Sequence, residues 1–197
     1  MASILVVCTG NVCRSPVAEG LLRRALRARF GDDAPGVTSA GTAAWEGSGA
    51  MPESVQASAE RGVDIASHVA QLLSSALLVQ ADLVLGMAAE HRVAVAGLVP
   101  GAAAKAFTLK ELVRLLEALP PGAAASRNAS FAARIAAADA LRQEGSEGNR
   151  WDEDVVDPLG MPLDTYRAIA WELDEWTDRL VAGLFGPVPA AVPGEEN

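Results

Sequence analysis

Cysteine is scarce in this chain, and both cysteines lie close together. The 197 residues include only two, Cys8 and Cys13. A small secreted domain held together by disulfides needs several cysteines spread along its sequence, so that architecture is excluded. Two neighbouring cysteines fit a reducing compartment and catalytic use, which predicts a cytoplasmic protein.

Long hydrophobic runs and an excess of positive charge are also lacking. Half of the residues are hydrophobic, enough for one globular core, but no run approaches the roughly 20 residues of a membrane span. The early apolar stretch Ile4–Val7 has four residues, too few for the core of a signal peptide. A net charge of −9 argues against nucleic acid or an anionic membrane surface as the main partner. We therefore expect no nucleic acid and no membrane among the partners.

The most informative segment has the sequence Cys-Thr-Gly-Asn-Val-Cys-Arg-Ser and spans residues 8–15. It follows the apolar run and precedes Pro16 and a helical pattern. Backbone N–H groups in a tight loop and at a helix N-terminus favour negative charge, and Arg14 can bind two phosphate oxygens. A thiol in that field is expected to be a thiolate at neutral pH. The segment indicates an oxyanion-binding loop in which Cys8 is a nucleophile.

Strand and helix patterns alternate along the chain. This alternation predicts an α/β fold in one domain, with a four-stranded parallel sheet, right-handed crossovers and helices on both faces. Ligands of such sheets bind at the carboxyl ends of the strands, which is where Cys8 would stand. The expected strands are 3–7, 37–42, 82–87 and 104–108, and the expected helices are 16–29, 52–61, a short one capped by Ser67, 90–98, 109–119, 130–141 and 162–183.

The domain is expected to span residues 1–185, followed by a disordered tail over 186–197 that is rich in proline and glycine. Residues from about 120 to 156 read as an insertion. It is either a lid or partner surface, or a tolerated surface insertion, and the second interpretation is favoured.

Together these features resemble the low-molecular-weight protein tyrosine phosphatases, a family that also includes arsenate-reductase relatives. The similarity extends beyond the cysteine loop, in family order, from residue 3 to about 184. The other matching segments are Ser39–Thr42 with Trp45, Gly62–Asp64 with Ser67 and His68, Asp82–Met87, and Asp157-Pro158.

The resemblance implies a phosphotyrosine protein phosphatase I-like fold and hydrolysis of phosphotyrosine through a cysteinyl-phosphate, with no metal and no cofactor. Cys8 would be the nucleophile, Arg14 would bind the phosphate, and Asp157 would act as general acid and then base. Asp152 and Asp154 compete for the acid role, but Pro158 stiffens the loop at Asp157. The other reading of Asp157-Pro158 is a plain turn.

The remaining loop residues would surround the phosphate: Thr9, Gly10, Asn11, Val12, Cys13 and Ser15. Gly10 would allow close approach of the backbone, and Asn11 is expected to adopt a left-handed conformation. Ser15 would donate a hydrogen bond to the Cys8 sulfur, or cap the first helix, or do both. The resemblance gives Asn11 a brace from Ser39 and His68, although a histidine at a helix start is the default reading of His68.

The substrate slot would have Trp45 as one wall and Leu159 as the other. The family often has an aromatic residue at the second place, so Leu159 weakens the preference for phosphotyrosine over smaller esters. Where the family often has a basic residue after the helix-start histidine, this chain has Val69. The resemblance also implies a reversible disulfide between Cys8 and Cys13, against a reading of Cys13 as a small buried hydrophobe.

Other functions stay open at this point. An arsenate reductase that uses an external low-molecular-weight thiol would need the same loop, whereas the thioredoxin-linked type needs further cysteines that the chain lacks. A protein that binds phosphotyrosine without turnover is a second alternative. A nucleotide-binding P-loop is excluded, because no Gly-Lys-Ser/Thr follows the glycine. The expected partners are a phosphotyrosine-containing protein, with a tyrosine kinase as one candidate, and phosphate or another oxyanion in the loop.

Overall fold

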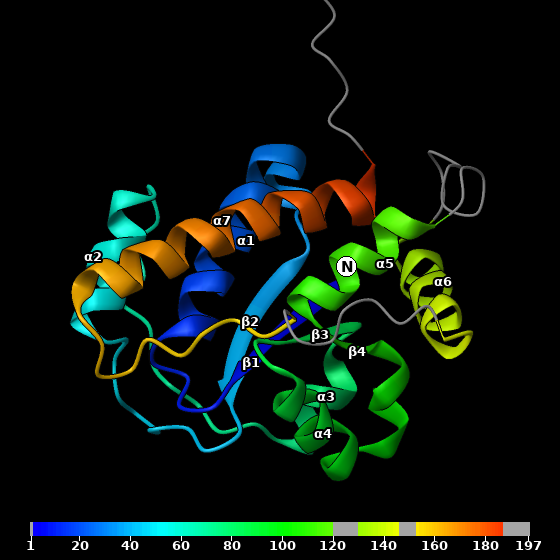
Figure 1. The fold of residues 1–197 in the computed structure, drawn as a ribbon, viewed down its shortest axis with the longest axis horizontal. Coiled ribbons are helices and arrows are strands. Elements are labelled where there is room, and N and C mark those ends of the chain that lie inside the picture. Colours follow the sequence, from blue (N-terminus) through cyan, green and yellow to red (C-terminus); the bar gives the residue numbers. More distant parts are fainter. Residues whose placement is uncertain (1, 120–129, 146–152, 187–197) are drawn as a thin grey trace, which may run out of the picture.

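The structure is a computed structural model and describes residues 2–119, 130–145 and 153–186 (Figure 1). From residue 187 on, the expected tail lies outside the described residues. So do 120–129 and 146–152 of the expected insertion, which include Asp152. Within the described ranges, none of the helices has the length and apolar character needed to cross a membrane.

Four parallel strands form the sheet, as the alternating pattern predicts. They are β1 (Ser3–Cys8), β2 (Gly36–Gly41), β3 (Leu83–Gly86) and β4 (Ala106–Thr108). Their order is β2-β1-β3-β4, so β1 lies between two neighbours and both of its edges are paired. Cys8, the last residue of β1, pairs with Gly41 at the carboxyl end of β2.

Side chains of β1 alternate between two apolar cores, as a strand buried on both faces requires. Ile4, Val6 and Cys8 belong to the larger core, and Leu5 and Val7 belong to the smaller one. All five side chains are almost completely buried. The apolar run that precedes the cysteine loop therefore fixes the end of β1 from both sides.

Helices cover both faces of the sheet (Figure 1). The larger core is covered by α1, α2, α5 and α7, with α6 packed against α5, while α3 and α4 cover the smaller core. Figure 1 shows α7 lying across α1, with α3 and α4 on the opposite side of the sheet. The bounds are α1 Arg14–Phe30, α2 Pro52–Glu60, α3 Ser75–Gln80, α4 Ala89–Leu98, α5 Leu109–Ala118, α6 Phe131–Gln143 and α7 Leu163–Phe185, with 3₁₀ turns at Gly31–Asp33 and Pro100–Lys105.

The prediction of a short helix that begins at Ser67 is wrong. Residues 63–73 form no helix, and the nearest one, α3, begins at Ser75 with Ser74 as its N-cap. The backbone of this segment bonds to other parts of the chain instead: Gly41 donates to the carbonyl of Gln71, and Leu73 donates to the carbonyl of Gly41. Pairing with the edge of β2 replaces the local hydrogen bonds of a helix.

The described part of the 120–156 region is anchored to the domain by α6. Phe131 at the start of α6 stacks on Phe185 at the end of α7, with ring centroids 5.5 Å apart. Near the end of α6, the guanidinium of Arg142 lies 4.2 Å from the ring centroid of Phe107 in β4. This helix therefore contributes to the same core as the sheet.

Gly41, at the end of β2, leaves no room for a side chain beside the cysteine loop. A Cβ atom at Gly41 would lie 2.5 Å from the carbonyl oxygen of Thr9 and 3.0 Å from the Cα of Ala44, and both neighbours are backbone atoms. We predict that Gly41→Ala lowers the free energy of unfolding by about 1–3 kcal/mol, the usual cost of overpacking.

Urea denaturation followed by tryptophan fluorescence measures this cost. The matched control is Gly36→Ala at the other end of the same strand, where a Cβ would meet nothing within 4 Å. Its effect should stay below about 1 kcal/mol. Equal effects of the two substitutions would show that the backbone of Thr9 does not exclude a side chain at residue 41.

Candidate active site

The cysteine loop, residues 8–15, connects β1 to the first turn of α1. The carbonyl groups of residues 8–12 all bond to surrounding segments. The carbonyl oxygens of residues 8, 9 and 10 accept hydrogen bonds from the N–H groups of Thr42, Ala43 and Trp45, at 2.9–3.0 Å. The carbonyl of residue 11 accepts from His68 Nε2 at 2.7 Å, and the carbonyl of residue 12 accepts from the N–H of Met51 at 2.8 Å.

These outward bonds determine where the N–H groups of the loop point. The structure contains no cis peptide bond in its described residues, and in a trans peptide the N–H is directed away from the preceding C=O. The N–H groups of residues 9–13 are therefore directed toward the inside of the loop. One of them, the N–H of Asn11, donates to Cys8 Sγ at 3.2 Å. The loop is a nest of donors suited to an anion.

Asn11 holds the loop in shape. Its φ of 55° confirms the expected left-handed conformation, and the residue is completely buried. Its side-chain amide donates to Ser39 Oγ at 2.8 Å and to Ser15 Oγ at 2.9 Å, while its Oδ1 accepts from the N–H of Gln71 at 2.9 Å. With His68 on its carbonyl, Asn11 is braced from β2, α1 and the 63–73 segment together.

Ser15 lies directly below the Cys8 sulfur, with Oγ and Sγ 2.9 Å apart. Its hydroxyl oxygen accepts from Asn11, so its own proton remains available for the sulfur. The reading of Ser15 as the helix N-cap is wrong: α1 begins at Arg14, Cys13 occupies the N-cap position, and no side chain caps it. Ser15 turns into the loop because its hydroxyl has two partners there.

Arg14 and Asp157 form an ion pair across the mouth of the loop, with Nη2 and Oδ2 2.6 Å apart. The guanidinium also donates from Nη1 to the carbonyl of Val155 at 3.0 Å, and its Nη2 lies 3.4 Å from Thr9 Oγ1. Its Nε is buried and has no hydrogen-bond partner among the described residues. A buried donor of this kind fits an oxyanion as its missing acceptor.

Asp157 reaches the loop from the segment that precedes α7. The N–H of Val155 donates to the carbonyl of Met87, just after β3, at 2.7 Å. Asp154 uses its carboxylate to accept from the N–H of Ala89 at the start of α4, at 2.7 Å. Of the two described aspartates that compete for the acid role, only Asp157 therefore faces the cysteine loop.

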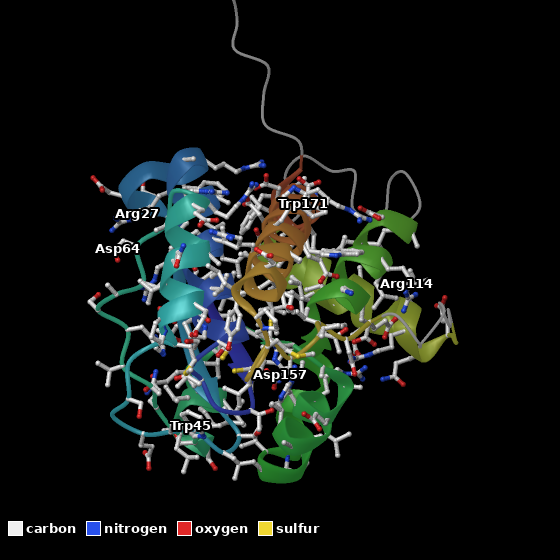
Figure 2. The ribbon with its side chains drawn as sticks, turned by 60° about the vertical axis from the view of Figure 1, so that its left-hand side comes forward. Arg27, Trp45, Asp64, Arg114, Asp157 and Trp171 are labelled. Atoms are coloured by element: carbon white, nitrogen blue, oxygen red, sulfur yellow. The ribbon has the colours of Figure 1, made fainter. Side chains whose placement is uncertain are left out.

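A cavity of about 180 Å³ opens above Cys8. Cys8, Arg14 and Asp157 line its base and one side. Trp45 and Leu159 stand at the mouth and are about half exposed. Figure 2 shows Asp157 near the middle of the molecule and Trp45 on a different segment. The other lining residues are Thr9, Gly10, Val12, Cys13 and Ala43, so the upper walls are mainly apolar.

Cys13 is a buried free thiol, as is Cys8. Burial raises the pKa of Cys13 to about 11, so this thiol is neutral at pH 7. Its sulfur lies 4.0 Å from the hydroxyl of Tyr166 in α7. The disulfide between Cys8 and Cys13 stays a prediction.

Sequence reasoning missed His91, which lies in the first turn of α4 and is 1% exposed. Its Nε2 is 3.1 Å from Thr9 Oγ1. Burial, and then the charge of Arg14, lower the pKa of His91 to about 4, so the ring is neutral at pH 7. Its place directly after the carboxyl end of β3 is the signal that could have identified it.

The described residues hold no group of three or more histidine, cysteine or acidic side chains arranged for a metal ion.

Comparisons with known proteins agree with the family suggested by the motifs. The model of the family described as low molecular weight phosphotyrosine protein phosphatase matches residues 3–119. The chain is 41% identical over 112 residues to a probable low molecular weight protein-tyrosine-phosphatase, EpsP, of Ralstonia solanacearum, which covers 56% of this chain and 72% of that protein. It is 33% identical over 181 residues to the protein-arginine-phosphatase of Bacillus subtilis, covering 92% and 95%.

Solved structures extend the similarity to the whole fold. The low molecular weight protein tyrosine phosphatase from T. tengcongensis superposes with a TM-score of 0.70 at 36% identity, and the match covers 93% of this chain and 100% of that one. The family model and the relatives together establish that this chain is a member of the low-molecular-weight protein-tyrosine-phosphatase family of hydrolases.

Proposed function

We propose that this protein is a protein tyrosine phosphatase that hydrolyses phosphotyrosine monoesters through a cysteinyl-phosphate intermediate, without a metal ion. The observation that carries the proposal is the cavity above Cys8. Its base combines a sulfur, a guanidinium with a free buried donor and a carboxyl group, and its upper walls are apolar. An aryl phosphate fits this cavity, with its phosphate at the polar base and its ring between the apolar upper walls.

In the first step, the ester phosphate would occupy the nest of loop N–H groups and replace the carboxylate of Asp157 on Arg14. The Cys8 thiolate attacks phosphorus and the bond to the phenolic oxygen breaks. On leaving Arg14, the Asp157 carboxylate takes up a proton from water, and it gives that proton to the phenolic oxygen, because phenolate is a modest leaving group. Arg14 and the loop N–H groups stabilise the charge on the equatorial oxygens, which removes the need for a metal.

In the second step, Asp157 would take a proton from a water molecule, whose oxygen attacks phosphorus. The bond between phosphorus and sulfur breaks and Cys8 leaves as a thiolate. Ser15 assists this departure, because its proton is free for the sulfur, with Oγ 2.9 Å from Sγ. The N–H of Asn11 supports the same negative charge.

We infer the partners and the location of the protein from the same features. The substrate is a phosphotyrosine-containing protein, with a tyrosine kinase as one candidate, and the protein acts in the cytoplasm. The thiolate requires a reducing environment, and neither a cofactor nor a nucleic acid enters the steps above. Trp45 and Leu159 would hold the ring between an aromatic and an aliphatic wall.

Phosphoarginine is a second candidate substrate, because a relative that matches over most of its length is named a protein-arginine-phosphatase. A phosphorylated guanidinium keeps polar N–H groups that need acceptors near the cavity mouth. Asp157 is the carboxylate among the lining residues, and the walls at Val12, Ala43 and Leu159 are apolar. Tyrosine is therefore the better match.

The first test is hydrolysis of aryl phosphates in the presence of a chelator. Cys8→Ser should abolish turnover, and Asp157→Asn should lower kcat about 10²- to 10⁴-fold for phenyl phosphate. The loss should be smaller for p-nitrophenyl phosphate, whose leaving group needs less protonation. The matched control is Asp154→Asn, because the Oδ1 of asparagine can still accept from the N–H of Ala89.

The same preparation is assayed for reduction of arsenate with a low-molecular-weight thiol. If arsenate is reduced and the esters are inert, the protein is an arsenate reductase. If phosphotyrosine peptides bind but are not hydrolysed by the wild type, it is a binding protein. If Asp154→Asn loses as much activity as Asp157→Asn, Asp157 is not shown to be the general acid.

A second prediction concerns the wall of the cavity. Trp45→Ala should raise KM for phenyl phosphate about tenfold, since a ring–ring contact contributes about 0.5–1.5 kcal/mol beyond the area that it buries. Inhibition by inorganic phosphate should not change, because phosphate has no ring. Trp171→Ala is the control, because Trp171 is exposed on α7 and does not line the cavity (Figure 2). Equal changes for ester and phosphate would contradict the wall assignment.

A third prediction compares substrates directly. Peptides of one sequence, carrying either phosphotyrosine or phosphoarginine at the centre, are assayed for kcat/KM. We expect the phosphotyrosine peptide to be preferred by at least about tenfold, because burying unpaired guanidinium N–H groups against apolar walls costs about 1–3 kcal/mol. The reverse preference would make the protein an arginine phosphatase.

A further inference from the structure

His91 has no role in the steps proposed above, yet it is buried beside them. The chain has two histidines. His68 binds the carbonyl of Asn11, whereas Nε2 of His91 contacts the hydroxyl of Thr9. His91 Nδ1 is buried with no hydrogen-bond partner among the described residues. Nε2 of His91 also lies 3.5 Å from Oε1 of the exposed Glu90. A buried histidine with an unpartnered ring nitrogen beside an oxyanion site is a candidate functional residue.

The hydroxyl of Thr9 connects His91 to Arg14. Arginine only donates hydrogen bonds, so Thr9 Oγ1 accepts from Arg14 Nη2, at 3.4 Å. Its other two neighbours are His91 Nε2, at 3.1 Å, and Glu90 Oε1, at 3.4 Å. His91 is the closer and the buried one, while the side chain of Glu90 is 70% exposed. The ring of His91 therefore fixes the hydroxyl that touches Arg14.

The contact between Thr9 and Arg14 would become one of the few protein contacts of the guanidinium when an oxyanion binds. In the structure, Nη2 has two partners, Asp157 and Thr9. The oxyanion would take the place of the Asp157 carboxylate, and Asp157 would turn to the leaving oxygen. Thr9 and the carbonyl of Val155 are then the protein partners that remain on the guanidinium. Thr9 is the one of these two that lies in the cysteine loop itself.

We propose that Thr9 and His91 are positioning residues: their hydrogen bond holds the guanidinium of Arg14 in the orientation in which its Nε and Nη2 face the oxyanion. The inference rests on the proposed function, because it takes Arg14 to be the oxyanion ligand. Burial keeps His91 neutral at pH 7, which avoids a second positive charge beside Arg14 and agrees with the inference. Glu90, Asp154 and Asp157 are the other charged groups that act on the ring.

Binding of inorganic phosphate to Cys8→Ser protein, measured by calorimetry, tests the pair without catalysis. In that background, Thr9→Val keeps the shape of the side chain but removes the hydroxyl, and His91→Leu removes the ring nitrogen. Each should weaken phosphate binding about tenfold, and the double variant should be no weaker than either single one. Thr9→Ser should recover most of the affinity that Thr9→Val loses.

The control on the same helix is Val93→Ala, an exposed position outside the cavity. Glu90→Ala separates the two neighbours of Thr9, because it removes the acceptor that a glutamine would keep. An effect as large as that of Thr9→Val would assign the anchoring role to Glu90 and overturn the one given to His91. Additive effects in the double variant, or wild-type affinity in Thr9→Val, would overturn the pair. If His91→Leu does not fold, Thr9→Val and Thr9→Ser still decide whether the hydroxyl positions Arg14.

With Cys8 restored, the same substitutions should raise KM for aryl phosphate together with the Kd for phosphate. A pair that only supported the fold would lower the melting temperature and leave KM unchanged. If the wild type hydrolyses no ester but phosphate binding shows the predicted coupling, the proposed function fails and the positioning pair stands. If hydrolysis occurs without coupling, only the positioning pair fails.

Discussion

The orientation of the peptide groups in the cysteine loop is the constraint on which the rest of the site depends. Each carbonyl from residue 8 to residue 12 is bound from outside, and a trans peptide then directs the next N–H inward. Three stretches supply these donors: residues 42–45, Met51 and the 63–73 segment. The last contributes His68 to a loop carbonyl and Gln71 to the side chain of Asn11. Much of the irregular structure around the sheet therefore serves to orient the peptide groups of one short loop.

That local polarity explains how a protein with a net charge of −9 can bind an anion. The loop supplies partial positive charge from its N–H groups. Arg14 supplies a full positive charge, and its side chain is only 5% exposed. Buried beside Thr9, His91 adds contact without adding charge, since its pKa is lowered to about 4. In the structure, the carboxylate of Asp157 balances Arg14, and the pair is desolvated only on the side of the arginine. Exchange of that carboxylate for another anion keeps the charge of the site balanced.

Local patterns in the sequence predicted the elements that local forces determine. The strands β1 and β3, the helix α2 and the left-handed Asn11 were all predictable, because each depends on residues near in sequence. The 63–73 segment was misread because its hydrogen bonds go to Gly41 and Asn11, which are far away in the chain. The contact of His91 with Thr9 and that of Arg14 with Asp157 join residues 82 and 143 positions apart, and only the meeting of the strand ends brings them together.

The position of Asp157 indicates which part of the site moves when an anion exchanges with its carboxylate. The preceding residues are fixed: Val155 is bonded to Met87 and to Arg14, and both the carboxylate and the carbonyl of Asp154 are bound, the latter by Lys110. After it, the N–H of Leu159 donates to Asp157 Oδ1 at 3.2 Å, which closes a tight turn. The side chain of Asp157, however, is 44% exposed. A carboxyl group on a fixed backbone can transfer from Arg14 to a leaving oxygen by rotation about its own side-chain bonds, so the exchange requires no opening of the loop.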